Sequence, residues 1–290
     1  LTQQELEKTI AKNKFNIRNT NNVVMVQCVG SRNEERPYCS RLCCSAAIKN
    51  ALKIKALDPE INIYILYRDI RTYGLLEDYY TKAREAGIFF IRYDLDSKPE
   101  VSIEQGALKI SVHDPSLGEQ LPLNPQLLVL STAVIPREND ELSTLMKLPR
   151  TRDGFFLEAH MKLRPVELAT DGIFLCGLAH SPKPLPESLS QAAAAVSRAC
   201  TLLSHDTITV GGMVATVNQD KCAVCLNCVR VCPYDVPFIN EDSVAQIDAA
   251  RCQGCGSCAA ECPGKAIQLQ HSTDMQILAK AEALFDVSKN

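Results

Sequence analysis

Two stretches, residues 222–233 (CAVCLNCVRVCP) and residues 252–263 (CQGCGSCAAECP), decide how the C-terminal part of this chain must fold. In each stretch three cysteines follow one another with two residues between neighbours, and a fourth follows after three more residues, directly before a proline. Cys222 recurs as Cys252, and Cys232 recurs as Cys262, so the pattern repeats after 30 residues. The chain therefore contains an internal duplication built around cysteine.

This spacing is that of the bacterial ferredoxins that hold two [4Fe–4S] clusters. Three thiolates spaced in this way can surround one corner of an iron–sulfur cube from a single tight loop, whose backbone N–H groups point at the sulfurs. The fourth cysteine lies where a short helix begins and is carried to the other cluster. The spacing predicts these ligand sets: Cys222, Cys225, Cys228 and Cys262 for one cluster, and Cys252, Cys255, Cys258 and Cys232 for the second.

Zinc and disulfide bonds are the alternatives for a cysteine-rich sequence. A four-cysteine zinc site needs two C-x-x-C pairs and would leave four of the eight cysteines unused. A disulfide framework is typical of short secreted chains, whereas this chain has 290 residues and shows no signal peptide at its start. Its 14 cysteines rather indicate a reducing compartment in which thiolates bind metal, so we expect a cytoplasmic protein.

The overall composition excludes several classes of protein. The net charge of −3 and the isoelectric point near 6.0 give no basic surplus of the kind that binds nucleic acid. No apolar run approaches the roughly 20 residues of a membrane-spanning helix, and no hydrolase motif appears. Because residue 1 is leucine rather than methionine, we expect the native polypeptide to be processed or longer at its N-terminus.

The N-terminal half alternates strand patterns with helical ones. The apolar run at residues 23–29 is typical of a buried strand in a parallel sheet. Helices and further strands are then predicted in alternation for residues 41–57, 61–67, 75–86 and 88–91. Residues 99–135 are expected to form an antiparallel excursion that returns to one last buried strand. This order predicts an α/β, Rossmann-like parallel-sheet domain.

A second set of cysteines stands where a nucleotide-binding unit carries its phosphate loop. The turn after the first strand has no G-x-G-x-x-G motif and carries Cys28, Cys39, Cys43 and Cys44 instead. Four thiols at the start of a helix form an anion site, which suits a thiolate-bound cluster, with a [4Fe–4S] cube favoured over a two-iron centre. Four buried structural cysteines remain the alternative, because the neighbours Cys43 and Cys44 would point about 100° apart on a helix.

A turn later in the chain could form one edge of a flavin site. Residues 171–177 (DGIFLCG) read as an apolar strand that ends in glycine, and residues 187–204 read as a helix. Backbone N–H groups at such a turn stabilise negative charge on a reduced flavin ring. The candidate flavin contacts are Gly177, Leu178, His180, Pro186, Ser188 and Gln191.

Two further expectations concern this same region. His180 could donate a proton or a hydrogen bond to the flavin, although an ordinary loop histidine has the same appearance in a sequence. A strand that feeds a helix is also often only part of a core, and Cys176 and Cys200 are expected to be buried core cysteines.

Taken in their order along the chain, these motifs resemble the A-type subunit of the heterodisulfide reductases, a flavin-containing iron–sulfur protein built on a thioredoxin-reductase-like scaffold. The resemblance covers about residues 23–270. It rests on residues 26–32 (VQCVGSR), the cysteines at 28, 39, 43 and 44, residues 171–177, residues 182–188 (PKPLPES) and the double ferredoxin motif.

The resemblance implies a third [4Fe–4S] cluster on Cys28, Cys39, Cys43 and Cys44, one FAD, and flavin-based electron bifurcation. It also implies a multi-subunit complex with B/C-type heterodisulfide reductase subunits and with a hydrogenase or formate dehydrogenase subunit that supplies electrons. Two departures limit it. These 290 residues contain no pyrophosphate-binding loop, so the chain resembles only the C-terminal part of the A-type subunit. Leu178 stands where relatives of the scaffold carry an acidic residue. FAD is therefore expected to be shared with another chain or a missing N-terminal half, or to be absent.

The expected division of the chain combines these segments. It runs as follows: 1–21, an N-terminal helix and linker; 22–135, the Rossmann-like half-domain with its cysteines; 136–206, the C-terminal part of an FAD-type domain; 207–271, a ferredoxin-like α+β domain with two [4Fe–4S] clusters; and 272–290, a C-terminal helix and tail.

The sequence thus predicts an electron-transferring oxidoreductase subunit that passes electrons between FAD and partner subunits through [4Fe–4S] clusters. The substrate chemistry is expected on those partners, and no catalytic residue can be identified. A non-catalytic, ferredoxin-like wiring module without its own flavin is the alternative. A fragment of an NAD(P)H-dependent flavoprotein is disfavoured, because the glycine-rich loop is missing and the second strand ends in Tyr67-Arg68 rather than in an acidic residue.

Overall fold

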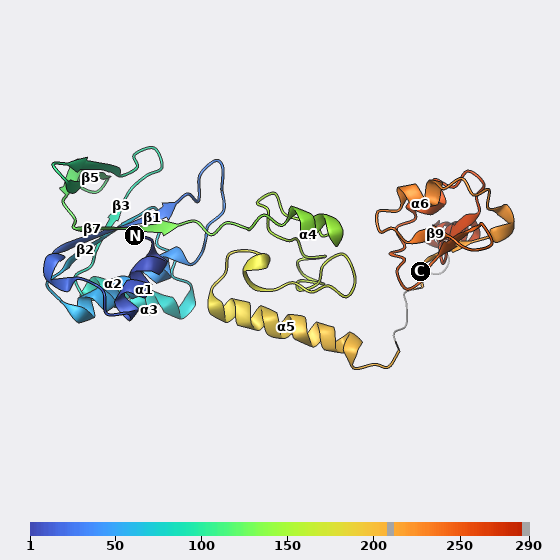
Figure 1. Cartoon of the computed structure of the whole chain (residues 1–290), viewed down its shortest axis with the longest axis horizontal. Coiled ribbons are helices and arrows are strands. Elements are labelled where there is room, and N and C mark those ends of the chain that lie inside the picture. Colours follow the sequence, from blue (N-terminus) through green and yellow to red (C-terminus); the bar gives the residue numbers. More distant parts are fainter. Residues whose placement is uncertain (208–211, 286–290) are drawn as a thin grey trace. The chain divides into compact units, whose positions relative to one another are not determined.

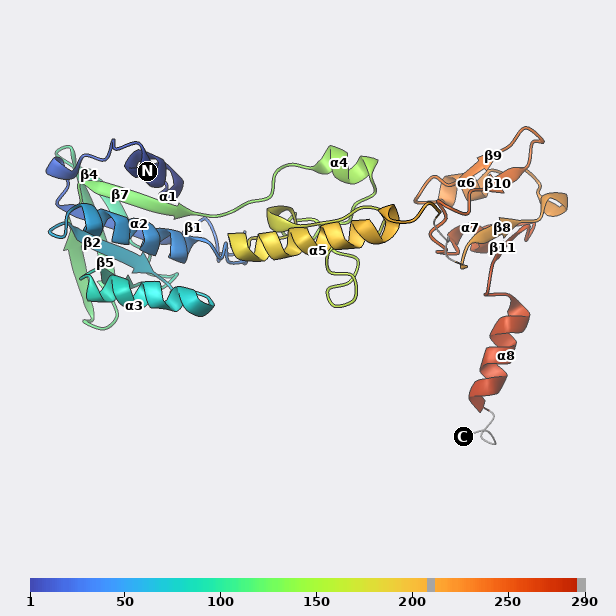
Figure 2. The same cartoon turned by 90° about the horizontal axis from the view of Figure 1, so that it is seen from below.

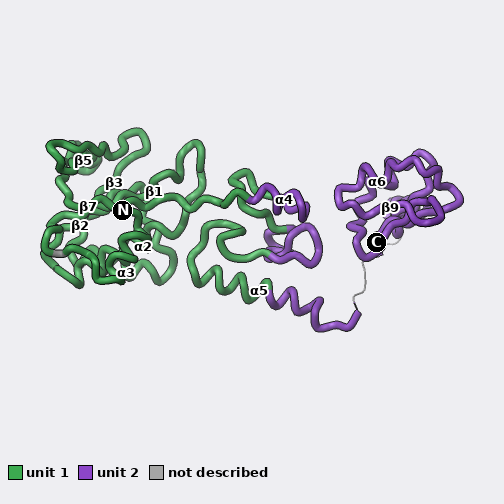
Figure 3. The backbone as a smooth tube through the Cα atoms, viewed as in Figure 1, with its two compact units in different colours: residues 1–138, 150–158, 175–195 green, residues 139–149, 159–174, 196–290 purple. Residues whose placement is uncertain are grey.

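The computed structural model describes residues 1–207 and 212–285, and it divides into two compact units (Figure 3). Unit 1 comprises residues 1–138, 150–158 and 175–195, and unit 2 comprises residues 139–149, 159–174 and 196–290. Unit 1 contains the Rossmann-like region and unit 2 contains the ferredoxin module. Among the described residues, no helix has the length and apolar character needed to cross a membrane.

A four-stranded parallel sheet forms the centre of unit 1 (Figure 1). Its strands stand in the order β3 (Phe89–Arg92), β2 (Asn62–Tyr67), β1 (Asn22–Val29) and β7 (Leu127–Thr132), and every neighbouring pair is parallel. In β1, residues 23–27 are buried without interruption, which is typical of a strand covered on both faces. The predicted parallel-sheet domain is confirmed.

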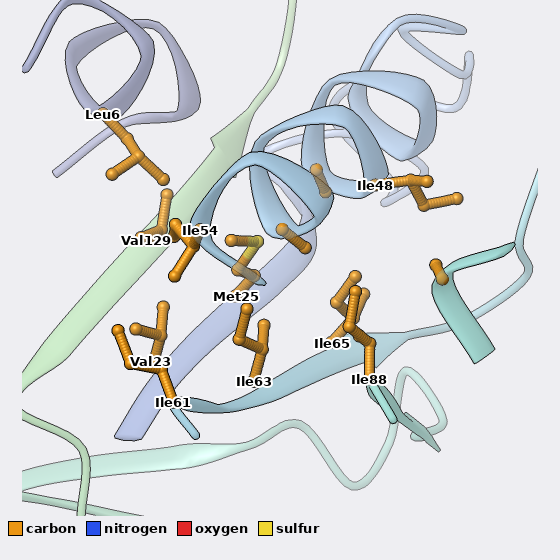
Figure 4. Packing of buried hydrophobic residues seen from close by; sticks show 13 residues of the cluster. Leu6, Val23, Met25, Ile48, Ile54, Ile61, Ile63, Ile65, Ile88 and Val129 are labelled. Atoms are coloured by element: carbon orange, nitrogen blue, oxygen red, sulfur yellow. The ribbon is translucent and has the colours of Figure 1, made fainter. Parts of the chain in front are cut away.

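Three helices cover one face of this sheet: α1 (Gln3–Ala11), α2 (Cys43–Leu57) and α3 (Glu77–Glu85) (Figures 1 and 2). Apolar side chains from all three meet those of the strands in one cluster, in which Leu6 of α1 and Ile54 of α2 lie over Val23 and Met25 of β1 (Figure 4). Because Leu6 is fully buried, α1 belongs to the core of unit 1 and is not a separate linker. Thr2 and Glu5 form a capping box at its start.

The predicted antiparallel excursion covers the opposite face. It consists of β4 (Glu100–Glu104), β5 (Ala107–Asp114) and β6 (Glu119–Leu123), paired in that order. Ile110 and Val112 of β5 are buried in one cluster with Val24 and Val26 of β1, which explains why β1 is apolar on both of its sides.

The middle of the chain corrects two expectations. Residues 171–177 do not form a strand, because Phe174 makes only an isolated bridge to Glu167 and finds no continuous partner strand. A single turn of 3-10 helix, Gly177–Ala179, follows. Cys176 and Cys200 are exposed, so their assignment as core cysteines was wrong. Besides α4 (Asp140–Leu145), the long helix of this region is α5 (Leu185–Leu203).

The ferredoxin module of unit 2 repeats its secondary structure as well as its cysteines. Its elements are β8 (Ala215–Val217), α6 (Asn227–Val231), β9 (Pro237–Ile239), β10 (Ala245–Ile247), α7 (Ser257–Ala260) and β11 (Ile267–Leu269). Pairing is antiparallel within β9–β10 and within β8–β11, so β8 and β11, from opposite ends of the module, are joined in one ribbon. The closing helix predicted after the module is α8 (Asp274–Phe285).

Candidate functional site

Two cavities in the ferredoxin module are lined by four cysteines each. One is lined by Cys222, Cys225 and Cys228 together with Cys262 of the second repeat. The other is lined by Cys252, Cys255 and Cys258 together with Cys232 of the first repeat. The structure thus brings together the same residues that the spacing groups, including the exchange of the fourth cysteine between repeats.

Backbone N–H groups of one repeat reach the thiols of the other. The N–H of Ala245 lies 3.4 Å from Cys222 Sγ, and the N–H of Ala215 lies 3.4 Å from Cys252 Sγ. Both the donors and the acceptors are related by the 30-residue repeat. A donor aimed at a thiolate favours its charged form, so these contacts prepare each cavity for an anionic ligand set.

The cysteine loops turn through left-handed backbone at equivalent places. Leu226 and Gly256 have φ values of 64° and 79°, and Val224 and Gly254 have φ values of 52° and 64°. A Cβ atom at Gly254 would come within 2.1 Å of the Met213 carbonyl oxygen, so this position admits glycine alone. These turns bend each loop around its own cavity, which the three cysteines of that loop line.

The thiols in the metal-free chain differ in acidity. Burial, followed by the neighbouring cysteines, raises the pKa of Cys258 to about 11, and burial also raises the pKa of Cys228. Hydrogen bonding to the Ser257 side chain and backbone lowers the pKa of Cys255, which is exposed. Metal binding to such a site must therefore release protons from the buried thiols.

We expect Cys255 to be the first ferredoxin cysteine to be alkylated in the metal-free chain, because the thiolate is the nucleophile. Replacing Ser257 with alanine should slow labelling at Cys255 several-fold near pH 7.5 and leave labelling at the equivalent Cys225 unchanged. Peptide mass spectrometry after a short pulse of iodoacetamide measures both rates. Equal slowing at Cys255 and Cys225 would show that the substitution acts through unfolding and not through the Ser257 contact.

The second set of cysteines surrounds the carboxyl end of β1 in unit 1. Cys28 lies at the end of β1 with a φ of 60°, and Cys43 and Cys44 open α2. The Cys43 Sγ lies 4.0 Å from the carbonyl oxygen of Thr132 on β7, and the Cys44 Sγ lies 3.7 Å from that of Asp69, which follows β2. Since β7 and β2 flank β1, the two adjacent thiols lie on either side of its end. Their divergence on the helix is therefore compatible with a shared ligand.

The four thiols are close enough to influence one another. Burial raises the pKa of Cys43 to about 12, with further contributions from Cys44, Cys28 and Cys39. Burial is also the main cause that raises the pKa of Cys28 and of Cys44, and Cys39 adds to both. The structure thus gathers all four predicted residues at one place.

Several cationic and N–H groups face this thiol set. The backbone N–H of Arg41 lies 3.3 Å from Cys39 Sγ, and Arg32 Nη1 lies 4.0 Å from Cys28 Sγ. Arg32 and Arg71 both pair with Asp69, at 2.5 and 3.3 Å. Positive charge beside the thiols favours an anionic cluster in this position.

Within residues 1–207 and 212–285, no three His, Cys, Asp or Glu side chains come together as a site for a single metal ion. A zinc ion would hold each sulfur at about 2.3 Å from one centre. In a [4Fe–4S] cube, each thiolate binds a different iron, so the ligands stand further apart.

The candidate flavin turn is organised by a partly buried polar network within unit 1. The N–H of Gly177 donates to Gln191 Oε1 at 2.9 Å, and Lys183 Nζ donates to the same oxygen at 2.7 Å. His180 is held between Glu158, at 2.9 Å from Nε2, and Lys183, at 2.8 Å from Nδ1. Sequence reasoning missed Glu158, because only the fold brings it to His180, whereas Lys183 lies three residues from His180 in the sequence and is buried.

The remaining predicted flavin contacts occupy different environments. Leu178 is 47% exposed, Pro186 is exposed, and Ser188 is half-buried beside Gly177. The Gly177 N–H that was expected to face a flavin is already bonded to Gln191. These residues can supply one edge of a flavin site, but the 290 residues include no glycine-rich loop for the pyrophosphate.

Comparisons with known proteins agree with this description. Residues 215–263 match a family model described as a 4Fe-4S dicluster domain. The chain is 36% identical over 270 residues to the A-type subunit of the ferredoxin:CoB-CoM heterodisulfide reductase of Methanosarcina acetivorans, covering 91% of this chain and 33% of that protein. It is 38% identical over 275 residues to the A-type iron-sulfur subunit of the CoB–CoM heterodisulfide reductase of Methanocaldococcus jannaschii, covering 91% of this chain and 41% of that protein.

The chain thus spans less than half of the length of these relatives. Among solved structures, the thioredoxin reductase of Lactococcus lactis aligns with 64% of this chain and 54% of its own, at 15% identity and a TM-score of 0.42.

Proposed function

Because the chain belongs to the family of A-type heterodisulfide reductase subunits, we propose that it carries electrons between a flavin and partner subunits through three [4Fe–4S] clusters. The chain covers only part of the length of these relatives. The observation that supports this most directly is the grouping of the ferredoxin cysteines around two cavities with an exchanged fourth ligand. The grouping of Cys28, Cys39, Cys43 and Cys44 at the end of β1 supports the third cluster.

In this proposal the clusters supply one-electron transfer, and the protein sets their positions and potentials. Backbone N–H groups such as those of Ala215 and Ala245 offset negative charge on the sulfurs. Arg32 and Arg71 place positive charge beside the third set, which favours its reduced state. Burial of Cys44, Cys228 and Cys258 keeps water from the ligands.

FAD belongs to the proposal as a cofactor that this chain would hold jointly with the rest of a longer protein or with another chain. The turn at Gly177 and Leu178 would face its ring, and His180, whose two ring nitrogens contact Glu158 and Lys183, would hold that turn in position. Burial lowers the pKa of Lys183, whose ammonium group contacts both His180 and Gln191.

The partners and the pathway are further parts of the proposal. We expect B/C-type heterodisulfide reductase subunits on one side, and a hydrogenase or formate dehydrogenase subunit on the other, in a flavin-based bifurcating complex. The substrate chemistry would take place on those partners. The 14 cysteines favour a reducing compartment, such as the cytoplasm.

A ferredoxin-like wiring module without its own flavin is the second candidate. The observation in its favour is that the Gly177 N–H donates to Gln191 instead of standing free for a ligand. In that function, unit 1 would serve as a docking platform, and the third cysteine set would either hold a cluster or remain thiols.

Iron, acid-labile sulfide and extractable flavin, measured per chain on anaerobically purified protein, test these functions. About twelve irons with one FAD would support three clusters and a self-sufficient flavin site, since each cube contains four irons. About twelve irons without FAD are the result that we expect, because the chain has no pyrophosphate loop. About eight irons and no flavin would instead overturn the third cluster and leave a two-cluster wiring module.

A further inference from the structure

Gln27 is the residue of β1 directly before Cys28, and its side chain is an anomaly in the core of unit 1. The residue is fully buried, yet neither its amide nitrogen nor its amide oxygen has a hydrogen-bond partner among the described residues. A flip of the amide, which exchanges its nitrogen and oxygen, provides no hydrogen-bond partner either, because both positions are unpartnered. A buried amide without a hydrogen-bond partner destabilises the fold, so an apolar residue here would give a more stable fold.

The other polar side chains buried on this side of the sheet form a separate set of contacts. Gln3 Nε2 donates to Ser131 Oγ at 3.2 Å, and Asn50 Nδ2 donates to Gln3 Oε1 at 2.9 Å. The Gln27 backbone is also held in place, because the Tyr93 hydroxyl donates to its carbonyl oxygen at 2.6 Å. Among residues 1–207 and 212–285, the buried oxygen of the Asn50 side chain also lacks a partner, but only the Gln27 amide is unpartnered at both of its ends.

The position of Gln27 indicates what its amide faces. Side chains alternate between the two faces of a strand. Val23 and Met25 belong to the cluster beneath the helices, while Val24 and Val26 belong to the opposite cluster (Figure 4). Gln27 is the next residue in the helix-facing row, and it lies in the stretch between Val26 and Val29 where the pairing of β1 with β7 shifts register.

The first turn of α2 carries two of the gathered thiols. The Cys43 Sγ lies beside the end of β7 and the Cys44 Sγ beside the residues after β2, so they stand on either side of the end of β1. Gln27 and Cys28 occupy that end. The unpartnered amide and the four thiols thus meet at the same carboxyl edge of the sheet.

We propose that the Gln27 amide N–H donates a hydrogen bond to a sulfur of the cluster held by Cys28, Cys39, Cys43 and Cys44, and that this bond raises the reduction potential of the cluster. The inference rests on the proposed function, which supplies the cluster. When the cluster takes up one electron from its redox partner, the charge on its sulfurs increases and no covalent bond is formed or broken. A donor aimed at sulfur therefore stabilises the reduced form more than the oxidised form.

The variant Gln27→Met tests the proposal, since methionine keeps a similar shape and removes the amide. In the metal-free chain, we expect the melting temperature to rise, because an unpartnered polar group is lost. In the cluster-loaded chain, we expect one midpoint potential to fall, with an approximately tenfold smaller equilibrium constant for one-electron reduction, which corresponds to 59 mV. EPR-monitored redox titration measures the potentials. Met25→Leu, on the same face of β1, is the matched control and should leave them unchanged.

Unchanged midpoint potentials in Gln27→Met at full iron content would overturn the inference. Equal destabilisation of the metal-free and the cluster-loaded chain would also overturn it, because Gln27 would then have a purely structural role. If Gln27→Met does not fold, Gln27→Leu provides the same comparison. The iron content separates this failure from that of the proposed function. About eight irons in the unmodified chain would remove the third cluster itself, whereas about twelve irons with unshifted potentials would remove only the role of Gln27.

Discussion

Replacing Cys43 with alanine should reduce the iron content from about twelve to about eight per chain, since one complete cube is lost when one of its four thiolates is removed. Cys43 is the most suitable target because its pKa responds to all three other thiols of the set. The large rise of that pKa, to about 12, shows that without a metal this position holds a neutral thiol. Iron and sulfide analysis, together with loss of one EPR component on reduction, measures the effect.

Cys176→Ala is the matched control, because Cys176 lies in the same unit but is exposed and belongs to none of the three sets. We expect its iron content to equal that of the unmodified chain. If Cys43→Ala also keeps about twelve irons, Cys43 is not a ligand. If the chain has about eight irons both before and after the substitution, the third cysteine set holds no cluster and consists of core thiols. A circular dichroism spectrum that matches the unmodified chain confirms that the sheet of unit 1 is intact.

How far the sequence predicts these sites depends on whether the ligands are local. The ferredoxin cysteines are grouped by spacing alone, because three ligands come from one loop and the fourth returns from a repeat of known length. The pair Cys43 and Cys44 could not be interpreted in that way, because adjacent residues on a helix diverge. Only the position of the helix over the end of β1, between β2 and β7, shows how both can face one ligand.

At the candidate flavin turn, the sequence pattern predicts a strand that the structure does not contain. Residues 171–177 have the apolar pattern of a buried strand, but a strand also needs a neighbour, and Phe174 finds only an isolated bridge. Glu158 carried no signal in the sequence, because its contact with His180 joins residues that are 22 positions apart. Likewise, nothing in the apolar run of β1 marks Gln27 as lacking a partner. Such features depend on tertiary contacts, which a pattern along the chain does not contain.

Stripping the metal should unfold the ferredoxin module and leave the sheet of unit 1 folded. The buried core of the module consists of Ala215, Cys228, Ala245, Cys258 and Ile267, so two of its five members are proposed cluster ligands, and its strands are three residues long. A domain of this size rarely folds on its apolar core alone, and metal binding then supplies the folding free energy. By contrast, 13 buried residues without a proposed ligand form the core beneath the helices of unit 1.

Hydrogen exchange with mass spectrometry, before and after treatment with a chelator under reducing conditions, measures both parts of one chain at once. Amides of β8 to β11 should lose their protection, while those of β1 and β2 keep theirs as the internal control. Protons compete with iron for the thiolates, and burial raises the pKa of Cys228 and, to about 11, that of Cys258. Metal affinity should therefore fall as the pH falls, and stripping should be faster at pH 6 than at pH 8. If the amides of β8 to β11 stay protected after complete iron removal, the module folds without its clusters. The apolar core alone would then maintain the cavities that the thiols line.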